Sequence, residues 1–109
     1  MTFDEYQFEA AKTMGKHWSD FKTGLAYGGL GLAGESGEVC EHIKKYVNGS
    51  RELDKEEVKK EIGDVLWYVA SISEHLGFKL HDAAELNIKK LRKRHGESFS
   101  GYGNRNEEG

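Results

Sequence analysis

The sequence contains no proline, one cysteine and no long apolar run, and each shortage narrows what the protein can be. A single cysteine, Cys40, excludes an intrachain disulfide and is typical of a reducing compartment. Apolar runs fall well short of the ~18 residues that span a membrane. The acidic N-terminus MTFDEYQFEA lacks the apolar core of a signal peptide. We therefore expect a cytoplasmic protein with no membrane partner.

An excess of basic residues is also missing. The net charge is −3 and the isoelectric point about 5.9, so no basic field favours a nucleic acid polymer as partner. The 109 residues suffice for one domain. Apolar residues make up 37% of the chain, below the ~45–50% usual for globular domains. Such a thin core favours self-association, and we expect a homodimer or homotetramer.

Apolar side chains recur every three or four residues along most of the chain, which predicts helices. The first helix starts at a Thr2–Glu5 capping box and ends near Gly15, and others cover about 30–47, 55–76 and 80–95. Between them, residues 15–29 combine glycines and aromatics, which favours a loop with at most a short helix. No segment alternates with period two. We expect an all-α bundle of about four helices over residues 1–95, with antiparallel neighbours, and a polar, mobile tail over 96–109.

Two copies of the pattern E-x-G-[E/D]-V, at 35–39 and 61–65, carry the most informative residues. Each places two acids three positions apart on one helical face. If the helices pack antiparallel, all four carboxylates converge, and carboxylate oxygens are ligands that Mg²⁺ and Mn²⁺ prefer. Glycines beside each pair allow close approach of a backbone, ion or substrate. The alternative is four solvated surface acids: Glu35, Glu38, Glu61 and Asp64.

The helix over 80–95 carries further candidates. Asn87 falls on its apolar stripe with Leu80, Ala84, Ile88 and Leu91, where it is either a core amide with partners or a ligand contact. Lys90 and Arg94 either meet phosphate oxygens or form a solvated basic edge.

Aromatic residues provide candidates for stacking on a nucleobase, although core packing is the commoner role at such positions. They are Trp18, Phe21, Trp67 and Tyr68. Histidine is a weaker candidate: His42 shares the helical face of Glu35, but no histidine follows a glutamate by three residues as in a di-iron bundle. An oxygen-only metal site is therefore expected. The phosphate loop G-x-x-x-x-G-K-[ST] and the zinc motif H-E-x-x-H are both missing.

Taken in order, these motifs resemble the MazG-like all-α nucleotide pyrophosphohydrolases. The resemblance rests on L-x-G-E-x-G-E-V at 32–39, E-x-G-D-V-x-W-Y at 61–68, N-x-x-K-L-x-x-R at 87–94 and F-x-x-Y-Q at 3–7. The family's E-x-x-E and E-x-x-D pairs match Glu35–Glu38 and Glu61–Asp64. One departure is His95-Gly96, where the family often has Tyr-Pro.

The resemblance implies a dimeric or larger helical assembly that binds Mg²⁺, with Mn²⁺ as a possible substitute. It implies hydrolysis of (deoxy)nucleoside triphosphates between the α and β phosphates, giving a monophosphate and pyrophosphate. Glu35, Glu38, Glu61 and Asp64 would hold the metal, and Glu35 or Glu38 would also orient or deprotonate water. Substrate would contact Asn87, Lys90 and Arg94. We expect Trp18, from the stacking candidates above, to contact substrate as well. The alternatives are a hydrolase of the same superfamily with another substrate, and a non-catalytic nucleotide-sensing or oligomerisation module.

Overall fold

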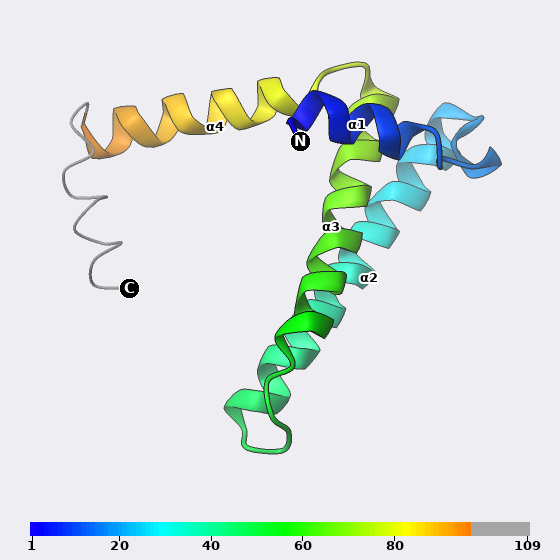
Figure 1. Ribbon diagram of the computed structural model, residues 1–109. Coiled ribbons are helices and arrows are strands. Elements are labelled where there is room, and N and C mark those ends of the chain that lie inside the picture. The colour runs from blue at the N-terminus through cyan, green and yellow to red at the C-terminus, as the bar shows by residue number, and fades with distance from the viewer. Residues whose placement is uncertain (97–109) are drawn as a thin grey trace.

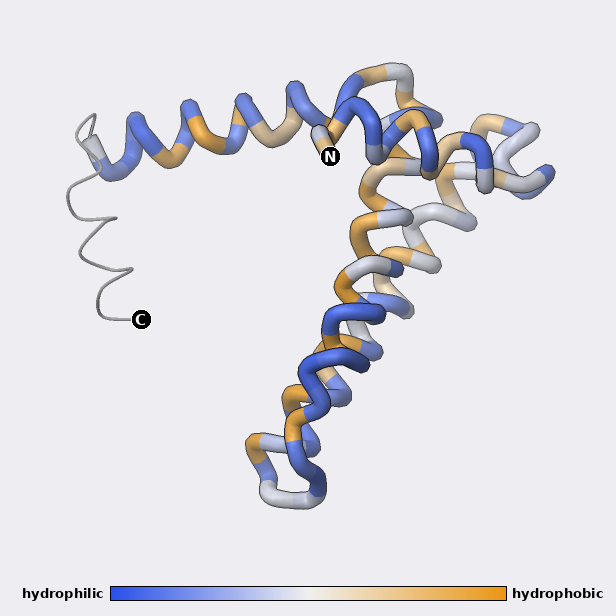
Figure 2. Tube along the Cα trace, viewed as in Figure 1, coloured by the Kyte–Doolittle hydropathy of each residue, from blue (hydrophilic) through white to orange (hydrophobic). Residues whose placement is uncertain are grey.

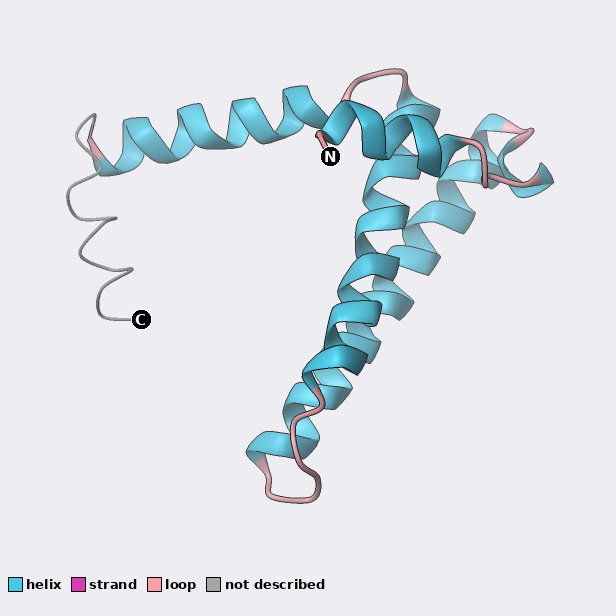
Figure 3. Ribbon diagram, viewed as in Figure 1, coloured by secondary structure: helices cyan, strands magenta, loops and turns pink. Residues whose placement is uncertain are grey.

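The computed structural model describes residues 1–96, and within that range it is built from helices, without strands (Figures 1 and 3). The predicted all-α class is confirmed. The elements are α1 (Phe3–Ala11), the 3₁₀ turn η1 (Lys16–Trp18), α2 (Phe21–Val47), α3 (Lys55–Leu76) and α4 (Leu80–His95). In the described part of the chain, no helix is both long and apolar enough to cross a membrane. The predicted tail, apart from Gly96, lies outside the described residues.

Local signals in the sequence start α1 and start and end α3 as expected, whereas α1 ends at Ala11, four residues before the predicted end at Gly15. Thr2 and Glu5 form the complete capping box at the start of α1. The Asp54 carboxylate accepts a hydrogen bond from the Glu57 amide at the start of α3. Gly77 ends α3 in the left-handed conformation, with φ of 84°, where glycine avoids the Cβ penalty. The predicted bounds of α3 and α4 are confirmed.

The loop expected over 15–29 is confirmed for residues 15–20, which contain η1, and is wrong from Phe21 onward, because α2 begins nine residues earlier than the predicted start at residue 30. Its N-cap is Asp20, whose carboxylate accepts a hydrogen bond from the Thr23 amide at 2.9 Å. Glycines at 24 and 28 are buried, and an added Cβ at either would overlap a ring or side chain of the neighbouring elements. Close packing thus outweighs the low helix propensity of glycine.

The central feature is the antiparallel hairpin of α2 and α3, drawn from cyan to green in Figure 1. Its seam is unusually close near the α1 end. An added Cβ at Gly28 would lie 2.8 Å from Ile72 and from Trp18, and one at Gly31 would lie 2.1 Å from the Tyr68 ring. The glycine-rich face of α2 is therefore the surface into which the aromatic side chains pack.

A small core joins α1, α3 and the start of α4. Its buried apolar residues are Ala10, Ala70 and Leu80. Gln7, also buried, fixes the α3–α4 turn: its side chain accepts a hydrogen bond from the Leu80 amide at 2.7 Å and donates to the Phe78 carbonyl at 3.0 Å. These bonds satisfy backbone groups at the corner and hold α1 across it.

Beyond that corner α4 runs away from the hairpin as an arm, so the antiparallel packing expected for it is wrong (Figure 1). Leu80 is buried, but Ile88 is 42% exposed and Leu86 69% exposed. Asn87 is exposed as well, which rules out the core amide considered from its position on the apolar stripe. The pattern correctly indicated an apolar face, but within one chain only Leu80 of that face is buried, while Ala84 and Leu91 are half-buried and Ile88 is exposed.

Gly28 and its neighbour Gly29 allow the close packing between α2 and α3 to be tested, with Gly29 as the control. Gly28→Ala should lower the free energy of unfolding by about 1–3 kcal/mol, because the new methyl group overlaps Ile72 and Trp18. Gly29→Ala meets no atom of the described residues within 4 Å and should raise stability by about 0.5–1 kcal/mol. Urea unfolding of both variants measures the difference, and equal midpoints would show that the seam is not tightly packed.

Candidate metal centre

Three of the four predicted carboxylates converge across the hairpin. Glu35 of α2 and Glu61 and Asp64 of α3 each offer an oxygen, and these oxygens all lie within 4.8 Å of one another. Glu35 and Glu61 are partly buried, whereas Asp64 is exposed. The convergence follows from antiparallel pairing, which places the two acidic motifs at the same height on facing helices. We refer to these three residues as the acidic cluster.

Glu38 does not join the acidic cluster. Its side chain is exposed, one helical turn beyond Glu35, and close enough for its charge to act on that residue. Gly37 and Gly63, expected to relieve crowding beside the acid pairs, face open space: an added Cβ would meet none of the described atoms within 4 Å. Within one chain, α2 and α3 approach each other closely at Gly28 and Gly31 instead.

The pKa of the Glu35 carboxyl is raised from its ordinary value. Partial burial is the largest cause, followed by the negative charge of Asp64 and then by a hydrogen bond and repulsion from Glu61. Each of these disfavours the ionised form. Clustered carboxylates therefore carry an electrostatic cost that a bound cation would remove.

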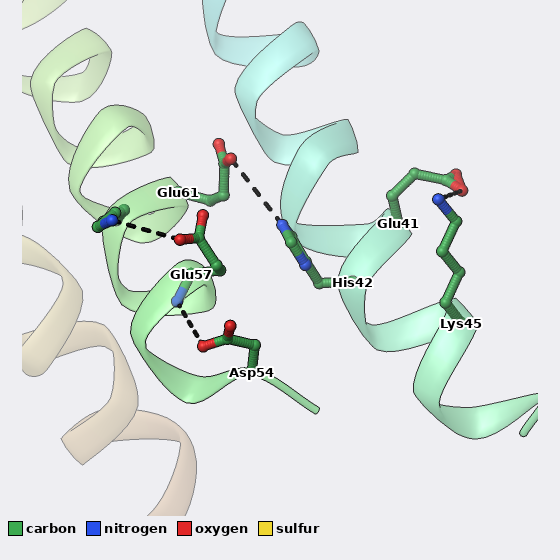
Figure 4. Close-up of polar contacts among 7 residues, drawn as sticks. Glu41, His42, Lys45, Asp54, Glu57 and Glu61 are labelled. Carbon is green, nitrogen blue, oxygen red and sulfur yellow. Dashed lines mark hydrogen bonds and ion pairs between the residues drawn. The ribbon is translucent and has the colours of Figure 1, made fainter. Parts of the chain in front are cut away.

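His42 is the basic neighbour of the cluster. Its Nε2 lies 3.9 Å from a Glu61 carboxylate oxygen, and Figure 4 shows the two side chains pointing toward each other from α2 and α3. Both side chains are largely buried, with 17% and 20% exposed. In the sequence, the signal for this contact is the position of His42 seven residues after Glu35, two turns along the same helical face.

The sequence indicated Tyr68 as a stacking candidate, but it did not indicate that tyrosines lie around the acidic cluster. The Tyr68 ring lies against Gly31, and a hydrogen bond with Tyr27, burial, and the charges of Glu35 and Asp64 raise its pKa. Burial and the charge of Asp64 raise the pKa of Tyr6 on α1. Phenols near anions stay protonated, so these side chains are available as hydrogen-bond donors beside the acids.

Comparison with known proteins then identifies the fold family. The family of the MazG nucleotide pyrophosphohydrolase domain matches residues 28–99. The chain belongs to this family. The matched part contains both acidic motifs and α4, while α1 and η1 precede it.

One curated relative matches the chain over most of its length. The "Gene 37 protein" of Mycobacterium phage L5 is 33% identical over 101 residues, covering 86% of this chain and 89% of the phage protein. No solved structure matches the chain. Membership of the MazG family therefore rests on the domain match and on the acidic motifs.

The substrate-binding residues expected in this MazG domain lie apart from the acidic cluster. Asn87, Lys90 and Arg94 are exposed along α4, the arm that leaves the hairpin (Figure 1). Trp18 is 8% exposed and packs edge-on against the rings of Trp67 and Tyr27. This placement favours the core role for Trp18, whereas the roles of the three α4 residues stay predictions.

The other aromatic candidates also take part in packing. Phe21 stacks on His75 with ring centroids 5.2 Å apart, and the Trp67 indole donates a hydrogen bond to the Thr13 hydroxyl at 2.7 Å. Tyr68 remains the aromatic residue with both packing contacts and proximity to the acids.

Repulsion within the acidic cluster should be measurable in the absence of metal. In chelator at pH 7, Glu35→Gln should raise the melting temperature, because it removes a charge facing Glu61 and Asp64. The raised pKa means that the Glu35 carboxyl binds its proton more tightly in the folded chain than in the unfolded chain. Wild-type stability therefore falls as the pH rises through that pKa. The gain from Glu35→Gln should therefore disappear below about pH 4, where both states are protonated.

The matched control is Glu56→Gln on α3. Glu56 is exposed and pairs with Lys59 at 3.0 Å, so the same substitution there removes a favourable contact. It should leave the melting temperature unchanged or slightly lower. An equal rise in both variants would indicate a general effect of net charge and not repulsion within the cluster.

Proposed function

We propose that this MazG domain hydrolyses nucleoside triphosphates between the α and β phosphates, releasing a monophosphate and pyrophosphate. The observation that carries the proposal is the convergence of Glu35, Glu61 and Asp64 from the two acidic motifs onto one point of the hairpin. The resemblance of the full motif order to the family's pyrophosphohydrolases supplies the reaction type.

The donor set of the acidic cluster fits Mg²⁺, with Mn²⁺ as a substitute. It offers carboxylate oxygens, the hard ligands these ions select, and their mutual repulsion is reflected in the raised pKa of Glu35. Glu35, Glu61 and Asp64 would hold the ion. A bound divalent cation would neutralise phosphate charge and lower the pKa of a coordinated water.

The remaining residues have distinct proposed roles. Glu38, exposed beside the cluster, can accept a proton from the attacking water and hold it in line with the phosphorus. His42 steadies the Glu61 carboxylate from the α2 side, as partners of metal-binding carboxylates commonly do. Tyr68 can donate a hydrogen bond to the substrate from the α1 side of the cluster.

Self-association is part of the proposal. The core contains few fully buried side chains, and large apolar residues such as Leu30 and Val47 are each 76% exposed. A second copy would remove such surface from water, at about 25 cal/mol per Å². We therefore propose a homodimer or a homotetramer as the active form.

The reaction is tested by product analysis and one carboxylate substitution. With Mg²⁺ and a panel of nucleoside triphosphates, phosphorus NMR should detect pyrophosphate and a monophosphate. Glu38→Gln should reduce kcat at least ~100-fold, the scale of losing a group that acts in the transition state. A diphosphate with orthophosphate would contradict cleavage between the α and β phosphates, and a lack of hydrolysis with every substrate would favour the nucleotide-sensing alternative.

Glu41→Gln is the matched control for that substitution. Glu41 follows Glu38 by three residues on α2 and forms ion pairs with Lys44 and Lys45 instead of joining the acids; the pair with Lys45 is drawn in Figure 4. Its kcat should stay within about twofold of wild type, because exposed ion pairs contribute little. If both variants lose activity equally, Glu38 has no special role.

Metal binding is tested separately from activity. Mg²⁺ should raise the melting temperature more than NaCl at equal ionic strength, since only the folded chain gathers the ligands; the gain is about 2.7 kcal/mol at a hundredfold excess over Kd. Glu61→Gln combined with Asp64→Asn should abolish the difference between the salts. A double variant that responds to Mg²⁺ as wild type does would remove these acids from the site.

A further inference from the structure

We propose a second cation position in the hairpin, beside the acidic cluster, with the His42 imidazole and the Glu61 carboxylate as its protein ligands. It would take a divalent transition-metal ion of the kind that binds nitrogen, such as Co²⁺ or Zn²⁺. This position rests on the part of the proposed function that assigns a cation to the acidic cluster, because Glu61 would be shared between the two ions. His42 would then bind metal itself, in addition to steadying Glu61.

The distance between the two side chains is the first observation. The His42 Nε2 atom lies 3.9 Å from a Glu61 carboxylate oxygen, which is longer than the ~2.7–3.2 Å of a hydrogen bond. A water molecule hydrogen-bonded to both atoms would hold them farther apart, at about 4.5 Å. Two ligands of one metal ion, each with a bond of about 2.1 Å, lie at most about 4.2 Å apart. The observed separation therefore fits a shared cation.

The direction and burial of both side chains are the second observation. Figure 4 shows His42 of α2 and Glu61 of α3 pointing toward each other across the hairpin. Only 17% of the His42 side chain and 20% of the Glu61 side chain are exposed. Polar groups with this little exposure usually bond to a partner, yet this pair lacks a direct hydrogen bond. A cation between them would satisfy both groups, because neutral imidazole nitrogen and carboxylate oxygen are both metal ligands.

Glu61 can serve two cation positions at once. Its carboxylate belongs to the acidic cluster, whose oxygens lie within 4.8 Å of one another, and among the described residues the His42 nitrogen lies outside that set. A carboxylate has two oxygens and can offer one to each of two ions. Sites with two metal ions commonly hold them about 3.5–4 Å apart. The His42 position is thus a neighbour of the acidic cluster and not a part of it.

The donor atoms distinguish the two positions chemically. The acidic cluster offers oxygens alone, which suit Mg²⁺, whereas imidazole nitrogen favours ions such as Co²⁺ and Zn²⁺. The expectation of an oxygen-only site considered histidines on the same helix as a glutamate, but His42 meets Glu61 across the hairpin. With two protein ligands, the position leaves room around the ion for water or for oxygens of a substrate.

A cation at this position would also link the two helices of the hairpin. Figure 2 shows mainly hydrophilic residues along the first half of α3, while hydrophobic residues become more frequent toward α1. Even the apolar Ile62, next to Glu61, is 53% exposed. One ligand from α2 and one from α3 would therefore join the helices in a part of the hairpin where hydrophilic residues predominate.

His81 and Glu85 of α4 provide a matched control. They also form a histidine–glutamate pair, but their nitrogen and oxygen lie 3.0 Å apart, within hydrogen-bond distance, and their side chains are 49% and 59% exposed. A direct contact of this kind leaves no space for an ion between the two groups. His81→Gln therefore removes one imidazole outside the hairpin, whereas His42→Gln removes one from the proposed position.

Calorimetric titration of the tag-free protein with Co²⁺ and with Mg²⁺ tests the position. We expect two Co²⁺ ions and one Mg²⁺ ion per chain in the wild type and in His81→Gln, but one ion of either metal in His42→Gln. If His42 only steadied Glu61, His42→Gln would weaken both metals by a similar factor, about 10–100-fold, without changing the number of ions bound. Equal numbers of Co²⁺ ions in the wild type and His42→Gln would overturn the position.

Proton NMR of the Co²⁺-loaded wild type is a direct test that does not require a folded variant. An imidazole bound to Co²⁺ should give an N–H resonance far outside the diamagnetic range, which disappears in D₂O. We expect this resonance in the wild type and in His81→Gln, and its loss in His42→Gln. If the wild type lacks it, histidine does not bind the metal and the inference is overturned.

The outcomes separate this position from the proposed function. A wild type that hydrolyses nucleoside triphosphates with Mg²⁺ but shows no histidine-bound Co²⁺ overturns the His42 position and leaves the hydrolase intact. A wild type that binds Co²⁺ through His42 but hydrolyses no nucleotide supports the position and overturns the hydrolase.

Discussion

Close packing along the seam between α2 and α3 is the constraint on which the rest of this structure depends. Gly28 and Gly31 give up side chains so that Trp18, Ile72 and Tyr68 can occupy that space. Each glycine costs a helix about 1 kcal/mol relative to alanine, and the packing of large apolar side chains offsets that cost. The same close approach brings Glu35 within reach of Glu61 and Asp64.

In the acidic cluster, the electrostatic cost to stability opposes the metal-binding role that we propose for it. Burial and neighbouring charges raise the pKa of Glu35, so the folded chain holds like charges together at neutral pH. Structural needs alone would favour neutral residues at these positions. A divalent cation bound between these carboxylates would remove their mutual repulsion, and its binding to the folded chain would stabilise the fold. Of the three acids, Glu61 is the one whose carboxylate lies near the His42 ring, at 3.9 Å.

The direction of α4 likewise exposes surface that is unfavourable in a single chain. The core around Ala10, Ala70 and Leu80 is small, and it fixes the corner between α3 and α4 more than it fills an interior. The Gln7 side chain sets that corner with hydrogen bonds to Phe78 and Leu80. An arm that points away from its own hairpin exposes apolar surface to water, which is unfavourable, and a second copy that covered this surface would recover that free energy.

Much of this could be predicted from the sequence because it depends on local rules. Periodicity and caps determined the class, the bounds of α3 and α4 and the capping box of α1. The spacing of the acid pairs predicted that four carboxylates would converge, and three of them do. The start of α2 could not be predicted, since its glycines disfavour a helix locally and only contacts with α3 and Trp18 reverse that preference. The contact of His42 with Glu61, the exclusion of Glu38 from the cluster and the direction of α4 were likewise decided by tertiary packing. An apolar stripe in a sequence indicates that one face of a helix is to be buried. It does not indicate whether the surface that buries it belongs to the same chain or to another.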